Sequence, residues 1–491
     1  ARGTEIGGQS QIGPGQRVVG GIGVAQADAV HEEECHSHPR MVPVFAAFAS
    51  CYKRAPMSLT QPASFPEHGS THGVHLRDGR LAGSPGPEAP AFAARGALYC
   101  VYPRAFSPRG TLAAVVPQLD RIAALGASAL WLLPIHPIGL RARKGSLGSP
   151  YAIRDYRAVN PEYGTREDLE ALVAAAHARG LKVILDLVVN HAAPDHSLVL
   201  ERASRALCDA DGNPTRRVSD WSDIVDWRFD DAFVVEHLLV SALGWIEAGI
   251  DGFRCDVAGM VPLEFWNELR RRMGPERFLL AEWQDAAHHE HAFHASYDWQ
   301  LYRALRDVAL GEKYALAVGA ALRSWQENFP RNAVPLRFVE NHDEPRAMAV
   351  MGRERLPANL AVAFLSGGLP LIYNGQEAGA SHRPSLFERE PVDWHGLEGD
   401  LPRLHADLVA RAVAWGPGPV SLVETDRPAA VVAFTRKTLA GHGAVVANLG
   451  RHAETVEVSL PARFAQVNGT GTHEGGALHL APGEAWIGET Q

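Results

Sequence analysis

Acidic residues stand at the ends of several strand-like apolar runs, in a fixed order along the chain. These runs are LKVILDLVVNH (ending at His191), GIDGFRCDVA (ending at Ala258), FLLAEW (ending at Trp283) and LRFVENHDE (ending at Glu344). An acid that closes a buried strand is costly, because its charge loses water. One such residue is explained by a structural ion pair, but several in succession point to one shared site. Carboxyl groups gathered in this way can divide the roles of nucleophile and proton donor.

The elements that must position these acids alternate between strand and helix. Eight strand-like runs follow from Leu98 onward, separated by helical stretches such as TREDLEALVAAAHARG, which opens on the capping residue Thr165 and stops at Gly180. Such an alternation favours a parallel sheet closed into a barrel, with the carboxyl ends of all strands on one face. We therefore predict an α/β fold, a (β/α)8 TIM barrel with a short insertion after the third strand and a C-terminal antiparallel β-domain.

Composition changes divide the chain into three predicted regions. Residues 1–95 are rich in Gly, Pro, Ser and His and predict a poorly ordered N-terminal extension. Residues 96–416 are predicted to form the barrel, with the insertion at about 192–225. Residues 417–491 contain short, evenly spaced strand candidates, which predict a C-terminal β-sandwich domain.

The 491-residue chain carries a formal net charge of −9, which argues against nucleic acid or an anionic membrane as its partner. No apolar run approaches the roughly 20 residues of a transmembrane helix. Five scattered cysteines do not suggest a disulfide framework. We expect a cytoplasmic monomer and interpret the short apolar run at 41–51 as fortuitous rather than as an export signal.

Two segments have the composition of metal sites but are better explained otherwise. HEEECHSH at 31–38 has no second ligand pair to close a site, so it is interpreted as a solvated polar tail. DADGN at 209–213 is similar to part of a calcium loop, but Pro214 stands where an EF-hand loop needs glycine. A surface turn is the simpler interpretation of that segment.

Four short regions occur in the order that defines the α-amylase superfamily, glycoside hydrolase family 13, and the chain resembles that family. The regions are DLVVNH at 186–191, GFRCDVA at 252–258, LLAEW at 279–283 and FVENHD at 338–343. Further similarity lies in LPIHPIG at 133–139, SPYAIRDY at 149–156 and PLIYNGQE at 370–377. The resemblance covers about residues 96–490. No single region would be specific for this family, but the occurrence of all four in this order is.

The resemblance implies roles for three carboxylates. Asp256 matches the catalytic nucleophile, Glu282 the general acid/base, and Asp343 the carboxylate that grips sugar hydroxyls and favours a distorted ring. Two carboxyl groups in the first two roles cleave a glycosidic bond with retention, through a covalent glycosyl-enzyme. The reaction itself requires two such groups, because one carboxylate must be ionised to attack while a second, protonated carboxyl group donates a proton to the leaving group.

The resemblance also implies a substrate-binding set and one supporting residue. Tyr151 matches an aromatic that stacks on the sugar, and His191 and His342 match donors to its hydroxyls. Arg254 matches the residue that holds the nucleophile ionised, and we expect it to lower the pKa of Asp256 by opposite charge. Asp186 matches a buried carboxylate that supports Arg254.

The chain departs from the family pattern around a structural calcium ion, which many α-amylases bind between the barrel and its insertion. Asn190 matches one calcium ligand, but Arg228 stands where an acidic or amide ligand is expected. Because a cation there would repel calcium, we predict no metal and no cofactor. Were calcium to bind, Asp223 or Asp226 would have to replace the missing ligand. A second departure is Met260, where many endo-acting amylases carry part of a Lys-His pair that holds the leaving-group side of the glucan.

The implied function is a retaining hydrolase of α-1,4-glucosidic bonds in starch or maltooligosaccharides. A transglycosylase or isomerase on the same scaffold, such as a glucanotransferase or a trehalose-forming enzyme, is the nearest alternative. A non-catalytic sugar-binding barrel is less favoured, because the chain keeps all three carboxylates. A phosphate-binding barrel enzyme would need a Gly-rich loop after the last strands, which here end in the acidic ENHDE and NGQE.

Overall fold

A computed structural model describes residues 74–75, 85–460, 464–469, 472–474 and 477–490. The segment 31–38 and most of the predicted N-terminal extension lie outside these residues. Two described residues of that region form strand β1 (Val74–His75), which pairs in parallel with β9 (Gln284–Asp285).

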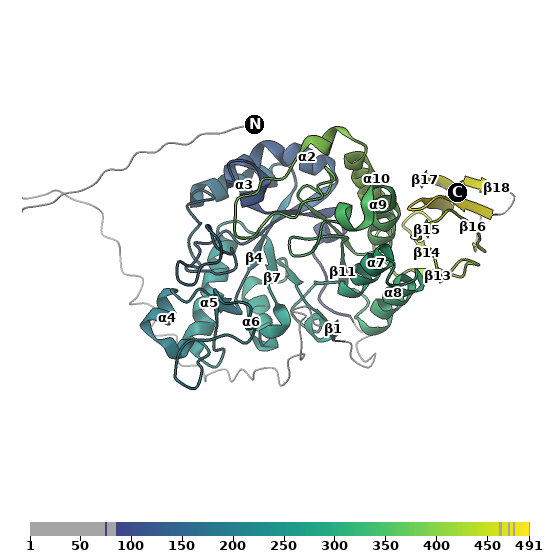
Figure 1. Cartoon of the computed structure of the whole chain (residues 1–491). Helices are drawn as coiled ribbons and strands as arrows, with labels where there is room; N and C mark the ends of the chain where they lie inside the picture. Colours follow the sequence, from purple (N-terminus) through teal and green to yellow (C-terminus); the bar gives the residue numbers. More distant parts are fainter. Residues whose placement is uncertain (1–73, 76–84, 461–463, 470–471, 475–476, 491) are drawn as a thin grey trace, which may run out of the picture. The chain divides into compact units, whose positions relative to one another are not determined.

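In the described part of the chain, eight parallel strands close into a barrel in the order β10-β11-β12-β2-β3-β4-β7-β8 (Figure 1). The predicted TIM barrel is therefore confirmed. In chain order these strands are β2 (Ala97–Val101), β3 (Ala127–Leu132), β4 (Lys182–Leu187), β7 (Gly252–Cys255), β8 (Phe278–Ala281), β10 (Ala295–Tyr297), β11 (Val334–Arg337) and β12 (Leu369–Tyr373).

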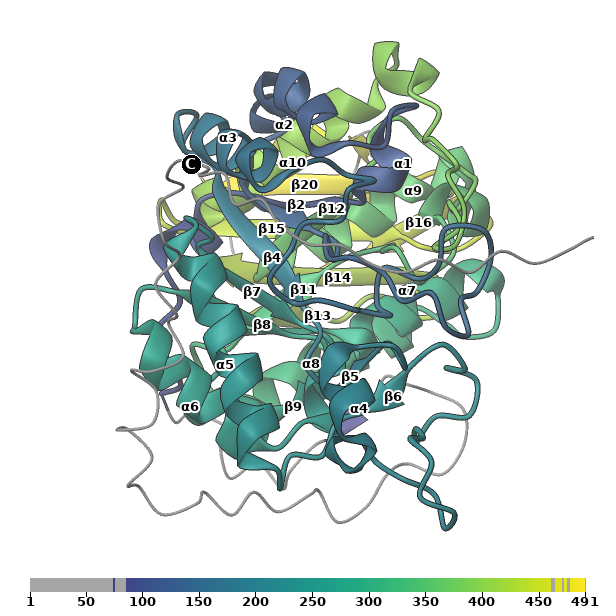
Figure 2. The same ribbon diagram turned by 90° about the vertical axis from the view of Figure 1, so that its left-hand side faces the viewer.

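Helices follow most barrel strands; α5 and α6, for example, lie outside β4, β7 and β8 (Figure 2). The connection from β8 to β10 differs, because it contains only β9 and a short 3-10 turn, η8 (Ala286–His289). The α-helices of the described chain are α1 (Pro103–Phe106), α2 (Leu119–Ala124), α3 (Arg166–His177), α4 (Ser197–Glu201), α5 (Ala232–Glu247), α6 (Leu263–Met273), α7 (Trp299–Leu310), α8 (Leu316–Asn328), α9 (Ala347–Leu365) and α10 (Leu401–Trp415).

Local sequence explains where α3 and α5 begin. The Thr165 side chain accepts a hydrogen bond from the Asp168 amide, and the Asp168 side chain accepts one from the Thr165 amide, so α3 opens with a complete capping box. Asp231 caps α5 without a reciprocal bond, its side chain accepting from the amides of Phe233 and Val234. These caps satisfy amides that have no partner within the helix.

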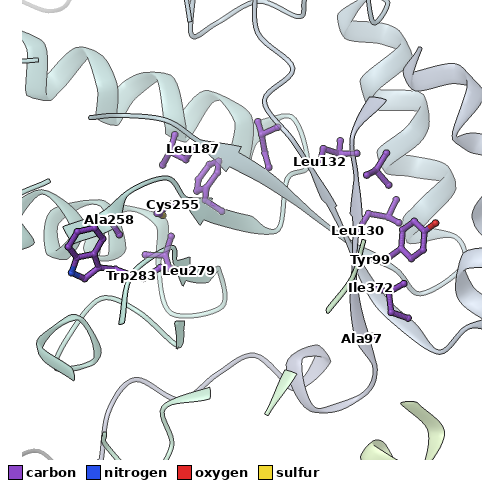
Figure 3. Packing of buried hydrophobic residues seen from close by; sticks show 14 of the residues in the cluster. Ala97, Tyr99, Leu130, Leu132, Leu187, Cys255, Ala258, Leu279, Trp283 and Ile372 are labelled. Atoms are coloured by element: carbon purple, nitrogen blue, oxygen red, sulfur yellow. The ribbon is translucent and has the colours of Figure 1, made fainter. Parts of the chain in front are cut away.

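Alternation along the strands separates two layers of side chains. Leu187 and Cys255 point out of the barrel and pack with Leu279 and Trp283 in the layer beneath the helices (Figure 3). Their neighbours point inward, because successive side chains of a strand face opposite sides. The inward positions on β4 and β7 are therefore those of Asp186 and Arg254. The strand period thus brings charged groups from separate strands into the barrel mouth.

The insertion after the third barrel strand leaves and returns through a small antiparallel pair. Strand β5 (His191–Ala192) pairs with β6 (Val225–Asp226), with His191 opposite Asp226. This pairing holds the base of the insertion beside the ends of β4 and β7. The predicted insertion after the third strand is confirmed.

Two antiparallel sheets follow the barrel, as the fold prediction expected. They pack on a shared apolar core that includes Val446, Val456, Leu478 and Trp486. Their orders are β13-β14-β15-β20-β17 and β16-β19-β18. In chain order the strands are β13 (Ser421–Val423), β14 (Val431–Lys437), β15 (His442–Asn448), β16 (Glu454–Glu457), β17 (Phe464–Gly469), β18 (Thr472–Glu474), β19 (Ala477–Leu480) and β20 (Ala485–Thr490).

Candidate active site

The backbone of the barrel fixes two of the predicted carboxylates directly. The Asp256 amide donates to the carbonyl of Leu187 at 3.1 Å, and the Glu282 amide donates to that of Cys255 at 3.0 Å. The strand ladder therefore continues one residue past β7 and β8. Both side chains start from rigid positions at the carboxyl face of the barrel, which is where sites form in this architecture.

Arg254 is the centre of the charged cluster. Its Nη1 lies 2.8 Å from Oδ1 of Asp186 and 3.0 Å from Oδ1 of Asp256. Its Nη2 lies 2.7 Å from Oε1 of Glu282. The structure thus brings Asp186, Arg254, Asp256 and Glu282 together around one guanidinium, and all four are almost fully buried.

Aromatic rings enclose this guanidinium. The Arg254 Cζ atom lies 5.2 Å from the Trp131 ring centroid and 5.8 Å from those of Tyr151 and Tyr297. The Trp131 indole also donates to Oδ2 of Asp186 at 3.3 Å. These rings exclude water and strengthen the charge interactions inside the cluster.

Burial dominates the ionisation of these carboxyl groups. Loss of water raises the pKa of Asp256 well above its ordinary value, and the neighbouring carboxylates Glu282 and Asp186 add to the increase. Arg254 opposes the increase without cancelling it, so the expectation of a lowered pKa for Asp256 is wrong in its net direction. Burial likewise raises the pKa of Asp186 to about 6 against the pull of Arg254.

The backbone between the two central carboxylates is strained. Val257, directly after Asp256, has φ 36° and ψ 49°, a left-handed conformation that a β-branched residue rarely adopts. In this conformation its amide donates to Oε2 of Glu282 at 2.8 Å. The strained residue therefore ties the segment after the β7 strand to the carboxyl group that follows β8.

Three further predicted residues meet at one side of the cluster. The Nε2 atom of His342 lies 3.1 Å from Oδ2 of Asp343 and 2.5 Å from the Tyr151 hydroxyl. The Tyr151 and His342 rings are stacked, with centroids 5.7 Å apart. The side chain of Asp343 is 32% exposed against 7% for Asp256, so Asp343 lies nearer the mouth of the site.

His191 approaches the cluster from the base of the insertion. Its Nε2 lies 4.0 Å from Oδ2 of Asp256, and its Nδ1 lies 3.1 Å from Nδ2 of Asn190. Burial lowers the pKa of His191 to about 4, although Asp226 and Asp223 oppose that change. The ring is therefore neutral near pH 7 and can donate through only one nitrogen.

A cleft of about 340 Å³ opens over these groups. Five predicted residues line it: Tyr151, His191, Asp256, Glu282 and Asp343. Arg254, His342 and Asp186 are not among the lining residues and stand behind those that are. The cleft thus exposes carboxylates and an aromatic ring while their charged supports stay buried.

Sequence reasoning missed several residues of the site. The cleft is also lined by Lys144, Trp221 and Phe387, from the loops that follow β3, β4 and β12, and by Asp223, which the sequence offered only as a calcium ligand. Lys144 pairs with Asp223 at 3.1 Å across that rim. Since loops carry no periodic signal, only Trp131 and its inward strand position could have been found from alternation.

Two of the side chains considered as calcium ligands, Asn190 and Asp226, contact an arginine instead. The Oδ1 atom of Asn190, the carboxylate of Asp226 and the carbonyl of Met260 all accept hydrogen bonds from Arg217. Arg228, which sequence alignment placed here, pairs with Asp230 on the surface. That placement was wrong, because the insertion returns a different arginine to this point. A donor set already held by a guanidinium does not fit a calcium ion.

A second cavity of about 350 Å³ lies at the amino ends of the barrel strands, lined by residues such as Gly96, Trp325, Val334 and Gly368. None of the predicted site residues lines it. The candidate active site is therefore the cleft at the carboxyl face of the barrel.

The closed barrel with a carboxylate cluster at its carboxyl face matches the family that the sequence resembles. Residues 62–222 and 218–418 match the model of the family described as alpha amylase, catalytic domain. The chain belongs to the α-amylase family of glycoside hydrolases, family 13. None of the helices in the described part of the chain is both long and apolar enough to cross a membrane.

Two curated relatives and one solved structure show the range of similarity. The chain is 32% identical over 402 residues to the α-amylase MalA of Haloarcula japonica, covering 76% of this chain and 58% of that protein. It is 28% identical over 395 residues to neopullulanase 2 of Thermoactinomyces vulgaris, covering 72% of this chain and 64% of that protein. The chain thus spans less than two thirds of both relatives.

The solved structure is an α-amylase from Lactobacillus plantarum. It superposes with a TM-score of 0.72 at 35% sequence identity, and the match covers 81% of this chain and 99% of that one.

Proposed function

We propose that the protein is a retaining hydrolase of α-1,4-glucosidic bonds, acting on starch or maltooligosaccharides through a covalent glycosyl-enzyme. The observation that carries the proposal is the meeting of Asp256, Glu282 and Asp343 around one cleft. Two of these carboxyl groups share the Arg254 guanidinium and so are held on neighbouring strands at fixed positions. Two carboxyl groups held in this way support a double displacement, in which one attacks the sugar and the other transfers the proton.

In the proposed reaction, the ionised form of Asp256, which Arg254 contacts, attacks the anomeric carbon while Glu282 gives its proton to the departing glycosidic oxygen. The Asp256–sugar bond forms as the glycosidic bond breaks, and Glu282 then takes a proton from the water that releases the sugar. Positive charge builds on the sugar ring in both steps. The buried negative cluster stabilises that charge, because burial strengthens the attraction.

The remaining residues are proposed to hold the sugar. Tyr151 offers a ring in the cleft on which the sugar stacks, and His191 and Asp343 bind its hydroxyls. His342, predicted from the sequence as a further donor to these hydroxyls, is buried behind the cleft and is proposed to position Asp343 and Tyr151, both of which its Nε2 contacts. The names of the relatives, an α-amylase and a neopullulanase, agree with α-glucan substrates.

Short α-glucans are the favoured substrate. The side chain of Met260 cannot hold a leaving glucan by hydrogen bonds, and it is almost fully buried. The Lys144–Asp223 ion pair also occupies part of the cleft lining. Both features support maltooligosaccharides over long starch chains.

Incubation with maltoheptaose tests the proposal, with products followed by chromatography and a reducing-end assay. We expect shorter maltooligosaccharides and rising reducing ends from the wild type, and loss of nearly all activity in Glu282→Gln, because the amide cannot donate the proton. Glu276→Gln is the matched control, since Glu276 is exposed and remote from the cleft. Longer products at constant reducing ends would identify a transglycosylase, and full activity of Glu282→Gln would refute the proposed proton donor.

A further inference from the structure

The guanidinium of Arg217 lies where three segments of the chain meet. Its Nε donates to Oδ2 of Asp226 at 2.6 Å, its Nη1 to the Met260 carbonyl at 3.2 Å, and its Nη2 to Oδ1 of Asn190. The Arg217 side chain is only 15% exposed, and that of Asp226 is 1% exposed. One cation thus links the end of β4, the returning strand of the insertion, and the turn η7 (Ala258–Met260) after Asp256.

The oxygen atoms that surround this guanidinium carry enough negative charge to balance one positive charge. Of the three oxygens named above, that of Asp226 belongs to a carboxylate and the other two are neutral, and Asp223, the other candidate ligand, is paired with Lys144. Calcium carries two charges and takes six to eight oxygen ligands at about 2.3–2.6 Å. A guanidinium instead needs several acceptors spread around its plane, which is what the three segments offer.

Arg217 also determines how Asn190 is oriented. A guanidinium only donates hydrogen bonds, so the atom of the Asn190 amide that faces it must be the oxygen. The amide nitrogen then faces Nδ1 of His191, 3.1 Å away, and that nitrogen must accept. The proton of the neutral ring is therefore on Nε2, which points toward Asp256 and the cleft.

We propose that Arg217 is a built-in cation that replaces a structural calcium ion and, through Asn190, positions the N–H of His191 toward the substrate. Arg217 is thus a positioning residue and does not itself touch the sugar. The positioning half of this proposal rests on the proposed function, because it assumes that His191 binds the sugar. The calcium half does not depend on it.

Thermal unfolding tests the calcium half without any activity assay. The wild-type protein is treated with EGTA, dialysed, and unfolded with and without millimolar calcium chloride. We expect the same Tm in both, because a site filled by a guanidinium gains nothing from the ion. A Tm that rises by several degrees with calcium overturns the proposal.

Kinetics on maltoheptaose test the positioning half. We expect Arg217→Ala to lower kcat/KM by about 10- to 100-fold, the range seen when the partner that orients a ligand is removed. His191→Ala should lower it at least as much, and the double variant no further than His191→Ala alone, because both changes remove one interaction. Losses that multiply in the double variant would mean that Arg217 does not act through His191.

Arg217→Lys separates charge from orientation, and it keeps the test open if Arg217→Ala does not fold. Lysine retains the positive charge beside Asp226 but cannot reach Asn190 and Met260 with a planar fork. Arg217→Ala should lower the Tm, because the buried Asp226 carboxylate loses its cation, and we expect Arg217→Lys to recover most of that loss while kcat/KM stays low. Full recovery of kcat/KM would show that charge alone suffices and would overturn the orientation step.

Arg228→Ala is the matched control, because Arg228 is the arginine of the same insertion that pairs on the surface with Asp230. It should change neither Tm nor kcat/KM. If the wild type has no activity on maltoheptaose while its Tm ignores calcium, the proposed function fails and the calcium half of the inference stands. If the wild type is active and its Tm depends on calcium, the inference fails and the proposed function stands.

Discussion

Arg254 shows at the residue scale how one side chain can organise several acids. It contacts Asp186, Asp256 and Glu282 with two nitrogens, within 3.0 Å in each case. A single positive charge cannot compensate three buried negative ones, so burial raises the pKa of Asp256 despite the contact. The arrangement is costly for the folded state, and such costs are retained where a reaction needs them.

Replacing Asp256 by asparagine separates catalysis from stability. We expect Asp256→Asn to lower kcat at least about a thousandfold, because the amide is not a nucleophile. The Tm should stay the same or rise, because the variant buries no charge at a position where burial disfavours the charged form. Steady-state kinetics and thermal unfolding measure the two effects. A tenfold loss of rate corresponds to only about 1.4 kcal/mol of activation free energy. If the variant kept more than about a tenth of the wild-type activity, the nucleophile role would therefore be contradicted.

The turn after β7 shows at the element scale how the site depends on close backbone packing. Val257 is held in a left-handed conformation, and Gly259, two residues later, lies against the ring of Trp283. A Cβ atom on Gly259 would stand 2.0 Å from that ring. Because Trp283 directly follows Glu282, the turn and the acid share one tightly packed contact.

Gly259→Ala tests this contact. The added methyl group must displace the Trp283 ring, so we expect a loss of about 1–3 kcal/mol in the free energy of unfolding and a fall in kcat of about tenfold, as Glu282 shifts with its neighbour. Urea unfolding and kinetics on maltoheptaose measure both. The control is Gly244→Ala in helix α5, where a Cβ meets nothing within 4 Å. It should gain up to about 1 kcal/mol without loss of activity. If Gly259→Ala and Gly244→Ala changed the free energy of unfolding and kcat equally, the proposed effect of the Gly259–Trp283 contact would be refuted.

Buried and half-buried histidines give the whole molecule a sensitivity to acid. Loss of water lowers the pKa of His136, His191, His196 and His237 to about 4, and that of His289 and His294 to about 3. When the chain unfolds, these rings regain water and take up protons from about pH 6.5 downward. The unfolded state therefore binds more protons between about pH 6.5 and 4, and the free energy of unfolding falls as the pH falls through that window.

His136→Asn measures one part of this dependence. His136 is fully buried beside Tyr156 and Trp245, and asparagine can still donate to the Ala158 carbonyl that Nδ1 contacts. We expect the drop in unfolding free energy between pH 7 and pH 5 to be about 1–2 kcal/mol smaller in the variant, because one proton uptake is removed. Urea unfolding at both pH values gives the difference. An undiminished drop would contradict the effect of burial on this ring. The control is His452→Asn, which alters an exposed imidazole and should leave the drop in unfolding free energy unchanged.

The sequence was sufficient for the features that repeat or that stand next to one another in the chain. Strand and helix periods predicted the barrel, and the strand-end positions of Asp256 and Glu282 predicted that they would meet. The capping residue Thr165 also marked the start of α3 correctly. Each of these follows from local propensity, from hydrophobic period or from the geometry of a parallel sheet, all of which are written in neighbouring residues.

Only the tertiary structure decided what depends on distant groups meeting. The net rise in the pKa of Asp256 comes from burial by residues on many strands, which no motif encodes. The loops that bring Lys144 and Phe387 to the cleft have no period from which their path could be derived. The arginine at the expected calcium position is Arg217 and not Arg228, because the insertion folds back on itself before it returns to the barrel. The sequence by itself thus determined which chemistry the chain carries, and the fold decided which charges surround it, because electrostatic energies depend on distances in space and on water removed by packing.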